Sequence, residues 1–341
     1  MRYLPAHAVS SHDERYAYAS GRIRALEMTL LGKQRLDRIA EAATLDEVMR
    51  KLSDTAYAPH LDEIEESGYQ VFLKNEERRL LDLVDSLSLD REVSDILRLR
   101  HDFHNLKVAL REKVSGRDLG DLYLDFGRFD TDEIAGPVKN ETPDRLPDVF
   151  VAVAKRALED YGASGDPGQA DILIDKAMFT HFLAVAGGYG GPFIKSIVRT
   201  WIDLANIRTF MRARYLGLEA RELPALLIEG GLVKPSDFSE VYQFTLDEIL
   251  GRFEFSPYRR VVEAGGAAAE KSGSFAPLER EIDNVVISFL RITRYFTFGL
   301  EVVLAYALIK QIEIKGLRLV LAAKDGGTAP AFIKERIPDA E

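Results

Sequence analysis

Asp102-Phe103-His104-Asn105-Leu106-Lys107 is the stretch of sequence that decides the fold, because a version of it returns twice. The second version is Asp203-Leu204-Ala205-Asn206-Ile207-Arg208, and the third is Glu313-Ile314-Lys315-Gly316-Leu317-Arg318. The shared pattern is an acid, two residues, an asparagine, an aliphatic residue and a base, with glycine replacing the asparagine in the third version. Recurrence at about 100 residues exceeds the period of a solenoid and indicates duplicated small domains.

A second element recurs over a longer distance. Thr44-Leu45-Asp46-Glu47-Val48-Met49 is followed by Tyr57, and Thr245-Leu246-Asp247-Glu248-Ile249-Leu250 is followed by Tyr258 at the same spacing. In each copy a threonine stands three residues before a glutamate, which is typical of the capping box that begins a helix. A match of this length without gaps supports internal duplication.

Helical periodicity dominates the chain, and alternating β-branched runs are scarce. We therefore predict an all-α fold of three similar helical domains with pseudo-threefold symmetry, at residues 1–115, 116–216 and 217–341. Three long helical pairs are predicted, and they suggest the three repeats. They are 62–87 with 90–114, 169–186 with 192–216, and 278–298 with 300–323. The run Gly265-Gly266-Ala267-Ala268-Ala269 is predicted to be a mobile linker.

Composition excludes several classes of function. The net charge is −10 and the isoelectric point is about 5.3, which disfavours general binding to phosphate backbones. The chain has no cysteine, which excludes disulfides, thiol catalysis and cysteine-ligated zinc. The N-terminus lacks the apolar core of a signal peptide. The longest apolar stretch, Phe296 to Ile309, contains Glu301 and is too short for a bilayer span, so we expect a buried helix.

Two weak signals of chemistry each have a plainer interpretation. His101 and His104 are three residues apart on one helix face, but no third metal ligand of clear pattern accompanies them. The glycine-rich run from Gly187 to Ser196 lacks the glycine that a phosphate loop places directly before its lysine, and its upstream segment is predicted to be a helix, so a turn is favoured. We predict no catalytic residue, metal or cofactor, and hence a protein that is not an enzyme.

The ordered motifs resemble those of the C-subunit family of V/A-type ATPases and ATP synthases, which is related to the d-type subunits of eukaryotic V-ATPases. The resemblance rests on Tyr16-Ala17-Tyr18-Ala19, the Thr55-x-Tyr57 ending, the stretch from Asp102 to Lys107, and the segment from Leu304 to Lys324. It covers nearly the whole chain, and the order of the pieces carries it.

This resemblance implies an all-helical, funnel-like protein of three domains that acts as a mechanical part. Its partners would be the central rotor shaft and the membrane ring of proteolipid subunits, with no nucleic acid and with membrane contact only through those partners. It would lie on the cytoplasmic side of the membrane as a peripheral part of the complex, coupling the shaft to the ring during ion transport or ATP synthesis. The alternative is an unrelated three-repeat helical adaptor.

The motif residues are the candidate site. The polar and basic positions of the three versions, with the bases that follow them, are Asn105, Lys107, Arg111, Asn206, Arg208, Arg212, Lys315, Arg318 and Lys324. One interpretation is local ion pairing that stabilises each domain, since most charges on helix faces are simply solvated. The other, tied to the resemblance, is that these bases contact an acidic surface of the shaft.

Overall fold

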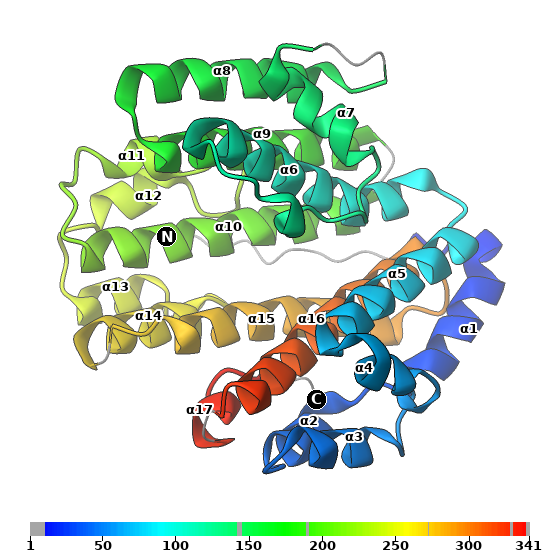
Figure 1. Cartoon of the computed structure of the whole chain (residues 1–341). Helices are drawn as coiled ribbons and strands as arrows, with labels where there is room; N and C mark the ends of the chain where they lie inside the picture. Colours follow the sequence, from blue (N-terminus) through cyan, green and yellow to red (C-terminus); the bar gives the residue numbers. More distant parts are fainter. Residues whose placement is uncertain (1–10, 142–144, 189–190, 272, 328–329, 339–341) are drawn as a thin grey trace. The chain divides into compact units, whose positions relative to one another are not determined.

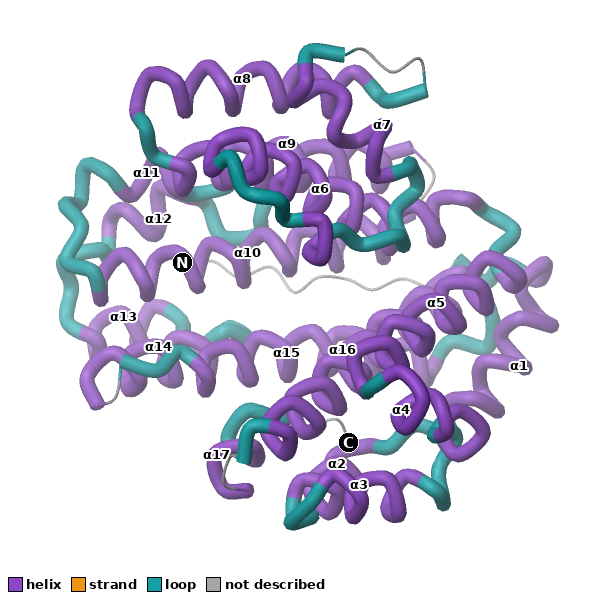
Figure 2. Tube along the Cα trace, in the orientation of Figure 1, coloured by secondary structure: helices purple, strands orange, loops and turns teal. Residues whose placement is uncertain are grey.

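The computed structural model describes residues 11–141, 145–188, 191–271, 273–327 and 330–338. Within these ranges the chain forms helices joined by loops and no strand, as Figure 2 shows, which confirms the all-α prediction. The α-helices are α1 (Ala17–Glu27), α2 (Gly32–Ala40), α3 (Leu45–Leu52), α4 (Asp62–Ser67), α5 (Tyr69–Leu87), α6 (Arg91–Ser115), α7 (Thr131–Ala135), α8 (Asp148–Ser164), α9 (Pro167–Gly188), α10 (Gly191–Tyr215), α11 (Leu223–Leu226), α12 (Pro235–Glu240), α13 (Leu246–Arg252), α14 (Arg259–Lys271), α15 (Ala276–Leu290), α16 (Leu300–Asp325) and α17 (Pro330–Lys334). Short 3-10 helices are η1 (Glu14–Tyr16), η2 (Ala58–His60), η3 (Gly120–Leu122), η4 (Gly136–Lys139) and η5 (Arg291–Tyr295).

The chain divides into two compact units, and α10 contributes to both. Unit 1 comprises Met1–Leu89, Asp203–Leu227 and Leu232–Glu341, whereas unit 2 comprises Asp90–Ile202 and Ile228–Gly231. The predicted division into three domains is not tested by this partition and stays a prediction.

Unit 2 is built on α6, which packs against α7, α8 and α9, while α8 packs along α9 (Figure 1). Its core is aromatic. The rings of Phe103 and Phe150 are stacked with their centroids 4.5 Å apart, and Phe182 meets Phe103 edge-on at 6.4 Å. All three rings are fully buried, and a cluster of this kind contributes both buried area and ring geometry.

Unit 1 is built on α16, which packs against α1, α2, α3, α5 and α15. Each residue from Leu300 to Leu308 is buried, which confirms a buried helix over this part of the predicted stretch, whereas Phe296 to Gly299 precede α16. Glu301 is buried in this stretch because its carboxylate accepts hydrogen bonds from the backbone N–H of Ser11 at 2.7 Å and from the Ser11 hydroxyl at 3.0 Å. Those two donors offset the cost of burying the charge.

The capping threonines of the duplicated element begin α3 and α13. The Thr245 hydroxyl accepts from the backbone N–H of Glu248, whose carboxylate accepts from the backbone N–H of Thr245 at 2.8 Å, a complete capping box. Thr44 caps α3 in the same way, but the Glu47 carboxylate accepts instead from the backbone N–H of Ala43 at 2.5 Å. The predicted helix starts are confirmed.

The prediction of a mobile linker at 265–269 is wrong, because these residues lie inside α14. A Cβ on Gly265 would stand 2.6 Å from the Leu278 side chain of α15, and a Cβ on Gly266 would stand closer than 3.0 Å to Leu246 of α13. The glycines serve close packing of α14 against its neighbours rather than flexibility.

Most of the long predicted helices are present, with two breaks. Gly68 adopts φ +83° and separates α4 from α5, so the predicted helix over 62–87 is interrupted. The helix predicted over 278–298 ends at Leu290 and continues as η5. The helices predicted over 90–114 and 300–323 correspond to α6 and α16. Those predicted over 169–186 and 192–216 correspond to α9 and α10.

Candidate functional site

The three acids that begin the repeated motif are buried on the three longest helices of the described chain. Asp102 lies on α6, Asp203 on α10 and Glu313 on α16. A buried carboxylate is costly unless several donors satisfy it, so the partners of each acid show what the motif does.

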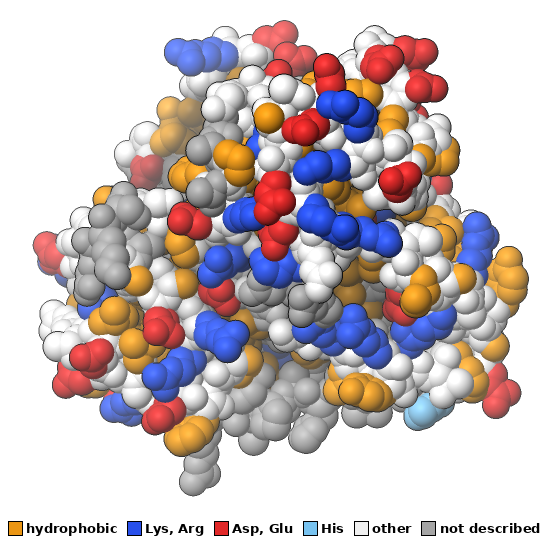
Figure 3. Space-filling view, turned by 90° about the horizontal axis from the view of Figure 1, so that it is seen from below, with side chains coloured by type: hydrophobic (Ala, Val, Ile, Leu, Met, Phe, Trp, Pro, Cys, Tyr) orange, Lys and Arg blue, Asp and Glu red, His pale blue; other side chains and the backbone are white. Residues whose placement is uncertain are grey.

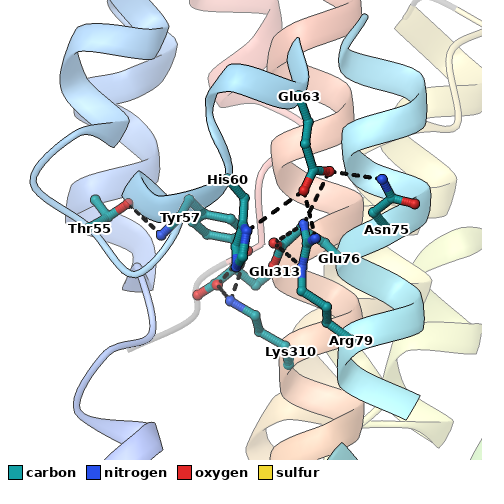
Figure 4. A network of polar contacts seen from close by, with 9 residues as sticks. All are labelled: Thr55, Tyr57, His60, Glu63, Asn75, Glu76, Arg79, Lys310 and Glu313. Atoms are coloured by element: carbon teal, nitrogen blue, oxygen red, sulfur yellow. Dashed lines mark hydrogen bonds and ion pairs between the residues drawn. The ribbon is translucent and has the colours of Figure 1, made fainter. Parts of the chain in front are cut away.

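Glu313 binds two segments of the N-terminal region, and Figure 4 shows its contact with Tyr57. Its carboxylate accepts from the backbone N–H of Leu31 at 2.5 Å, from the hydroxyl of Tyr57 at 2.8 Å and from the ammonium of Lys310 at 2.7 Å. The Lys310 ammonium also donates to the Tyr57 hydroxyl at 2.9 Å and lies 4.0 Å from the centre of the tyrosine ring. Burial and the adjacent Glu313 carboxylate raise the pKa of Tyr57 well above its ordinary value, so the hydroxyl remains a donor.

Asp203 binds an equivalent set of donors. Its carboxylate accepts from the backbone N–H groups of Leu232 and Val233 at 2.9 and 3.0 Å, and from the hydroxyl of Tyr258 at 2.8 Å. Leu232 and Tyr258 are each 201 residues after Leu31 and Tyr57, which hold the same places around Glu313. The duplicated element therefore provides a tyrosine latch on each of two long helices, and we use that name for the acid with its tyrosine and backbone donors.

Within the described residues, the carboxylate of Asp102 accepts hydrogen bonds only from backbone N–H groups. The N–H of Arg128 lies 2.9 Å from one carboxylate oxygen, and the N–H of Phe129 lies 3.3 Å from the other. A Cβ on Gly127 would stand closer than 3.0 Å to the same carboxylate, so the loop approaches because this residue is glycine. Burial raises the pKa of Asp102 to about 7, against the lowering effect of the Phe129 N–H and of Arg98.

The asparagines of the motif are buried. The side-chain amide of Asn105 donates to the carbonyl of Leu124 at 2.7 Å and accepts from its N–H at 2.9 Å, so it fixes the loop that follows α6. Asn206 is also fully buried on α10. In the third version Gly316 is also buried, and a Cβ at this position would lie in ordinary contact with the Leu36 side chain of α2, at 3.6 Å. These asparagines are internal, so a partner does not reach them on the folded chain.

In unit 2 the motif bases pair with acids of α9. The Lys107 ammonium lies 2.5 Å from the carboxylate of Asp175, and Arg111 pairs with Asp171. The two bases are four residues apart on α6, and the two acids are four residues apart on α9, so the two ion pairs lie one turn apart along both helices. Lys107 is mostly covered, whereas 53% of the Arg111 side chain is exposed. Ion pairs at this level of exposure contribute about 0–1 kcal/mol each.

In unit 1 the same arrangement involves α15. Arg208 and Arg212 of α10 share the carboxylate of Glu279 at 2.7 and 3.1 Å, and Lys315 of α16 pairs with Asp283 at 2.7 Å. Burial raises the pKa of Asp283, and Lys315 opposes that shift. Three bases thus meet two acids, which leaves one excess positive charge along this row.

The remaining two bases differ from the others. Arg318 is exposed and forms no ion pair with any residue that the structure describes. Lys324 is half-buried near the end of α16, where burial and the neighbouring Lys51 lower its pKa. Figure 3 shows that basic and acidic side chains are interspersed over one face of the molecule, together with exposed hydrophobic side chains. Local pairing thus accounts for five of the motif bases, and contact with a shaft stays a prediction.

The acids that receive these bases were missed in the sequence. Asp171 and Asp175, and 108 residues later Glu279 and Asp283, form two pairs of acids four residues apart. A search for acid pairs that match the spacing of the bases Lys107 and Arg111 finds them, because residues four apart share a helix face.

The structure also places most of the residues that gave the two weak signals for a metal or phosphate site. The His104 ring nitrogen lies 3.0 Å from the Leu122 carbonyl, and the ring of His101 packs edge-on against Phe126 at 5.5 Å. Among the described residues, no three His, Cys, Asp or Glu side chains come together in a way that would hold a metal. Residues 189 and 190 of the glycine-rich run lie outside the described residues, and the segment before them is helix α9, as predicted.

Comparison with known proteins identifies the family. The family model of the ATP synthase (C/AC39) subunit matches residues 19–336. The chain belongs to this family.

Relatives of this C/AC39 chain include the C subunit of the V-type sodium ATPase of Enterococcus hirae, which is 23% identical over 318 residues, 92% of this chain and 95% of the relative. The C subunit of the A-type ATP synthase of Thermococcus gammatolerans is 26% identical over 336 residues, 94% of this chain and 89% of the relative. The corresponding A-type ATP synthase protein of Desulfurococcus sp. is 24% identical over 334 residues, with coverage of 94% and 90%.

These matches confirm the resemblance that the repeated motif and its flanking segments indicated, and they set aside an unrelated helical adaptor. The chain is a C/AC39 subunit of the V/A-type ATPase and ATP synthase family, all-helical in the described ranges. No helix of the described part of this C/AC39 chain has the length and hydropathy needed to cross a bilayer.

Proposed function

We propose that this chain is a non-catalytic coupling subunit of a V/A-type rotary ATPase, which seats the central shaft on the proteolipid ring of the membrane. The observation that carries the proposal is the family match from residue 19 to residue 336. The relatives are named as subunits of a sodium ATPase and of ATP synthases, and each is covered over most of its length.

The contacts within the chain suit a part that transmits torque. A coupling subunit must resist twisting, so its helices need contacts whose loss costs free energy. The tyrosine latches at Glu313 and Asp203, and the backbone donors around Asp102, fasten loops onto α16, α10 and α6 with hydrogen bonds. Leaving one buried polar group unsatisfied costs about 1–3 kcal/mol. The ion pairs of α9 and α15 add lateral links.

In this role the chain performs no chemistry. It binds no nucleotide or metal, meets the membrane only through its partners, and lies on the cytoplasmic side. The row of bases on α10 and α16, with one positive charge in excess over the acids of α15, is where we expect an acidic surface of the shaft to dock.

Affinity purification of the tagged chain from native membranes in mild detergent tests this function. We expect mass spectrometry to find proteolipid, central-shaft and catalytic-head subunits with it. A parallel strain that lacks the chain should release the soluble head from its membranes and lose ATP-driven ion transport. Recovery of the chain alone, from membranes in which the ATPase is shown to be intact, would contradict the proposal.

A further inference from the structure

A cleft of about 380 Å³ opens on unit 1, between the end of α1, the turn into α2, and the junction of α15 with η5 and α16. Its wall is mostly apolar and includes Leu30, Ile287, Leu290 and Ile309. Pockets of this size receive a few side chains or a small molecule. Neither the latches nor the ion-pair rows use this cleft, apart from Glu313, which is one of its lining residues.

The cleft is held open by fixed contacts. The Arg24 guanidinium of α1 donates to the carbonyls of Thr293 and Phe296, the latter at 2.8 Å, and pairs with Glu27 at 2.8 Å. These bonds tie α1 to η5 across the cleft. The site is therefore formed before any partner arrives, which lowers the entropic cost of binding.

The lining includes one exposed apolar side chain, and two more exposed apolar residues are neighbours of lining residues in the chain. Met28 lines the cleft and is 82% exposed, and Tyr295, next to the lining residue Arg294, is 88% exposed. Ile292 lies between the lining residues Arg291 and Thr293 and is 38% exposed. Single exposed apolar residues need no explanation, but an exposed Met28 in the wall of a mostly apolar concavity favours an interaction site. Methionine adapts to irregular partners, and tyrosine is enriched at interface hot spots.

The charge of the cleft is positive although the whole chain carries −10. Three arginines line it, against two glutamates. Glu27 is paired with Arg24, and Glu313 is buried among the donors of its latch, which leaves the positive charge at the rim. Arg294 is exposed and forms no ion pair with a described residue. The electrostatic complement is an acidic group beside an apolar one.

We propose that this cleft receives a segment of another subunit of the same complex, in which an apolar side chain enters the cleft and a neighbouring carboxylate meets Arg294. The identity of the complex rests on the function proposed above. A lipid surface fits less well, because the apolar wall is concave and of side-chain size, whereas a bilayer presents a broad fluid surface to an amphipathic helix face.

A pair of matched variants tests the surface. Met28→Ala with Arg294→Glu shortens the exposed apolar side chain of the cleft and reverses the charge, while Phe255→Ala with Arg50→Glu makes the corresponding changes at exposed positions away from the cleft. Each chain, fluorescently labelled, is reconstituted with membranes stripped of the wild-type chain, and its dissociation rate is followed after dilution. We expect the cleft variant to leave about tenfold faster than the control variant, with an unchanged unfolding temperature for both. Equal dissociation rates would overturn the proposal.

A photo-crosslinking residue, p-benzoylphenylalanine, in place of Met28 identifies the occupant in the assembled complex. We expect a crosslinked peptide from another subunit that carries Asp or Glu within a few residues of an apolar side chain. A crosslink to lipid, a crosslink to a peptide without an acidic residue, or no crosslink in a complex that retains all its subunits would each overturn the cleft proposal. These outcomes leave the coupling function standing. That function fails separately, if the chain does not purify with the ATPase.

Discussion

The Tyr57 hydroxyl donates a 2.8 Å hydrogen bond to the Glu313 carboxylate, although the two residues are 256 positions apart. Tyr258 makes the same bond to Asp203 at 2.8 Å. The N-terminal segment around Leu31 and Tyr57 thus holds, on α16, the place that the segment around Leu232 and Tyr258 holds on α10. Each latch joins residues that the division at 115 and 216 assigns to different domains, while the division itself stays a prediction.

Removing the hydroxyl of the latch should destabilise unit 1. In the Tyr57→Phe variant, Glu313 keeps Leu31 and Lys310 but loses one buried donor. We expect the free energy of unfolding to fall by about 1–3 kcal/mol, measured by urea denaturation. Tyr18→Phe is the control, because Tyr18 is 75% exposed and its loss should change stability by less than about 0.5 kcal/mol. Equal midpoints for the two variants would show that the latch does not stabilise the fold.

Alanine in place of Gly265 should destabilise the chain, because its Cβ would stand 2.6 Å from the Leu278 side chain. Overpacking of this kind costs about 1–3 kcal/mol. Gly251→Ala is the matched control, since nothing lies within 4 Å of its Cβ position in α13, and it should stabilise by roughly 0.5–1 kcal/mol. If 265–269 were a mobile linker, Gly265→Ala would be neutral or stabilising, so thermal unfolding of the two variants separates the explanations.

The stability of unit 2 should depend on pH through two adjacent groups with opposite signs. Burial raises the pKa of Asp102 from an ordinary 3.8 to about 7, so the folded state binds that proton more tightly and stability falls as pH rises from about 4 to 7. Burial lowers the pKa of His101 from 6.5 to about 4, so the unfolded state binds more protons and stability rises over nearly the same range. The two effects oppose each other in the wild type.

The Asp102→Asn variant should reveal the histidine effect. Relative to the wild type, its free energy of unfolding should increase between pH 4 and pH 7, by at most about 4 kcal/mol for a shift of about three pKa units. A constant offset from the altered hydrogen bonds does not change with pH and cancels in this comparison. Urea titrations at intervals of pH measure the difference, and a difference that stays flat would contradict the raised pKa of Asp102.

Exchanging the two charges of an ion pair distinguishes internal pairing from contact with a shaft. Lys107→Glu with Asp175→Lys restores attraction between α6 and α9 but moves the positive charge from one helix to the other. We expect stability within about 1 kcal/mol of the wild type, whereas Lys107→Glu alone places two carboxylates together and loses more. Binding to purified central-shaft subunits is then measured. If Lys107 contacts the shaft, the double variant binds more weakly, and if it serves only internal pairing, binding is unchanged.

The sequence by itself determined the helices and the kinship of the repeats. Apolar periodicity and the capping threonines Thr44 and Thr245 act over a few residues, so they can be read without knowing the fold. The repeated acid, base and tyrosine positions were also visible, and their order indicated the family that the comparisons identified.

Only the tertiary structure decided what those repeated residues do. The acids of the motif accept hydrogen bonds from segments far away in the sequence, as Glu313 does from Tyr57. Five of the motif bases form ion pairs with acids of α9 and α15. Gly265 and Gly266 have the composition of a linker, yet they are fixed by the approach of α13 and α15. Which helices pack together decides the hydrogen-bond partners, the ion-pair partners and the space for a Cβ. Local periodicity shows which face of a helix is buried, but not which other helix covers it.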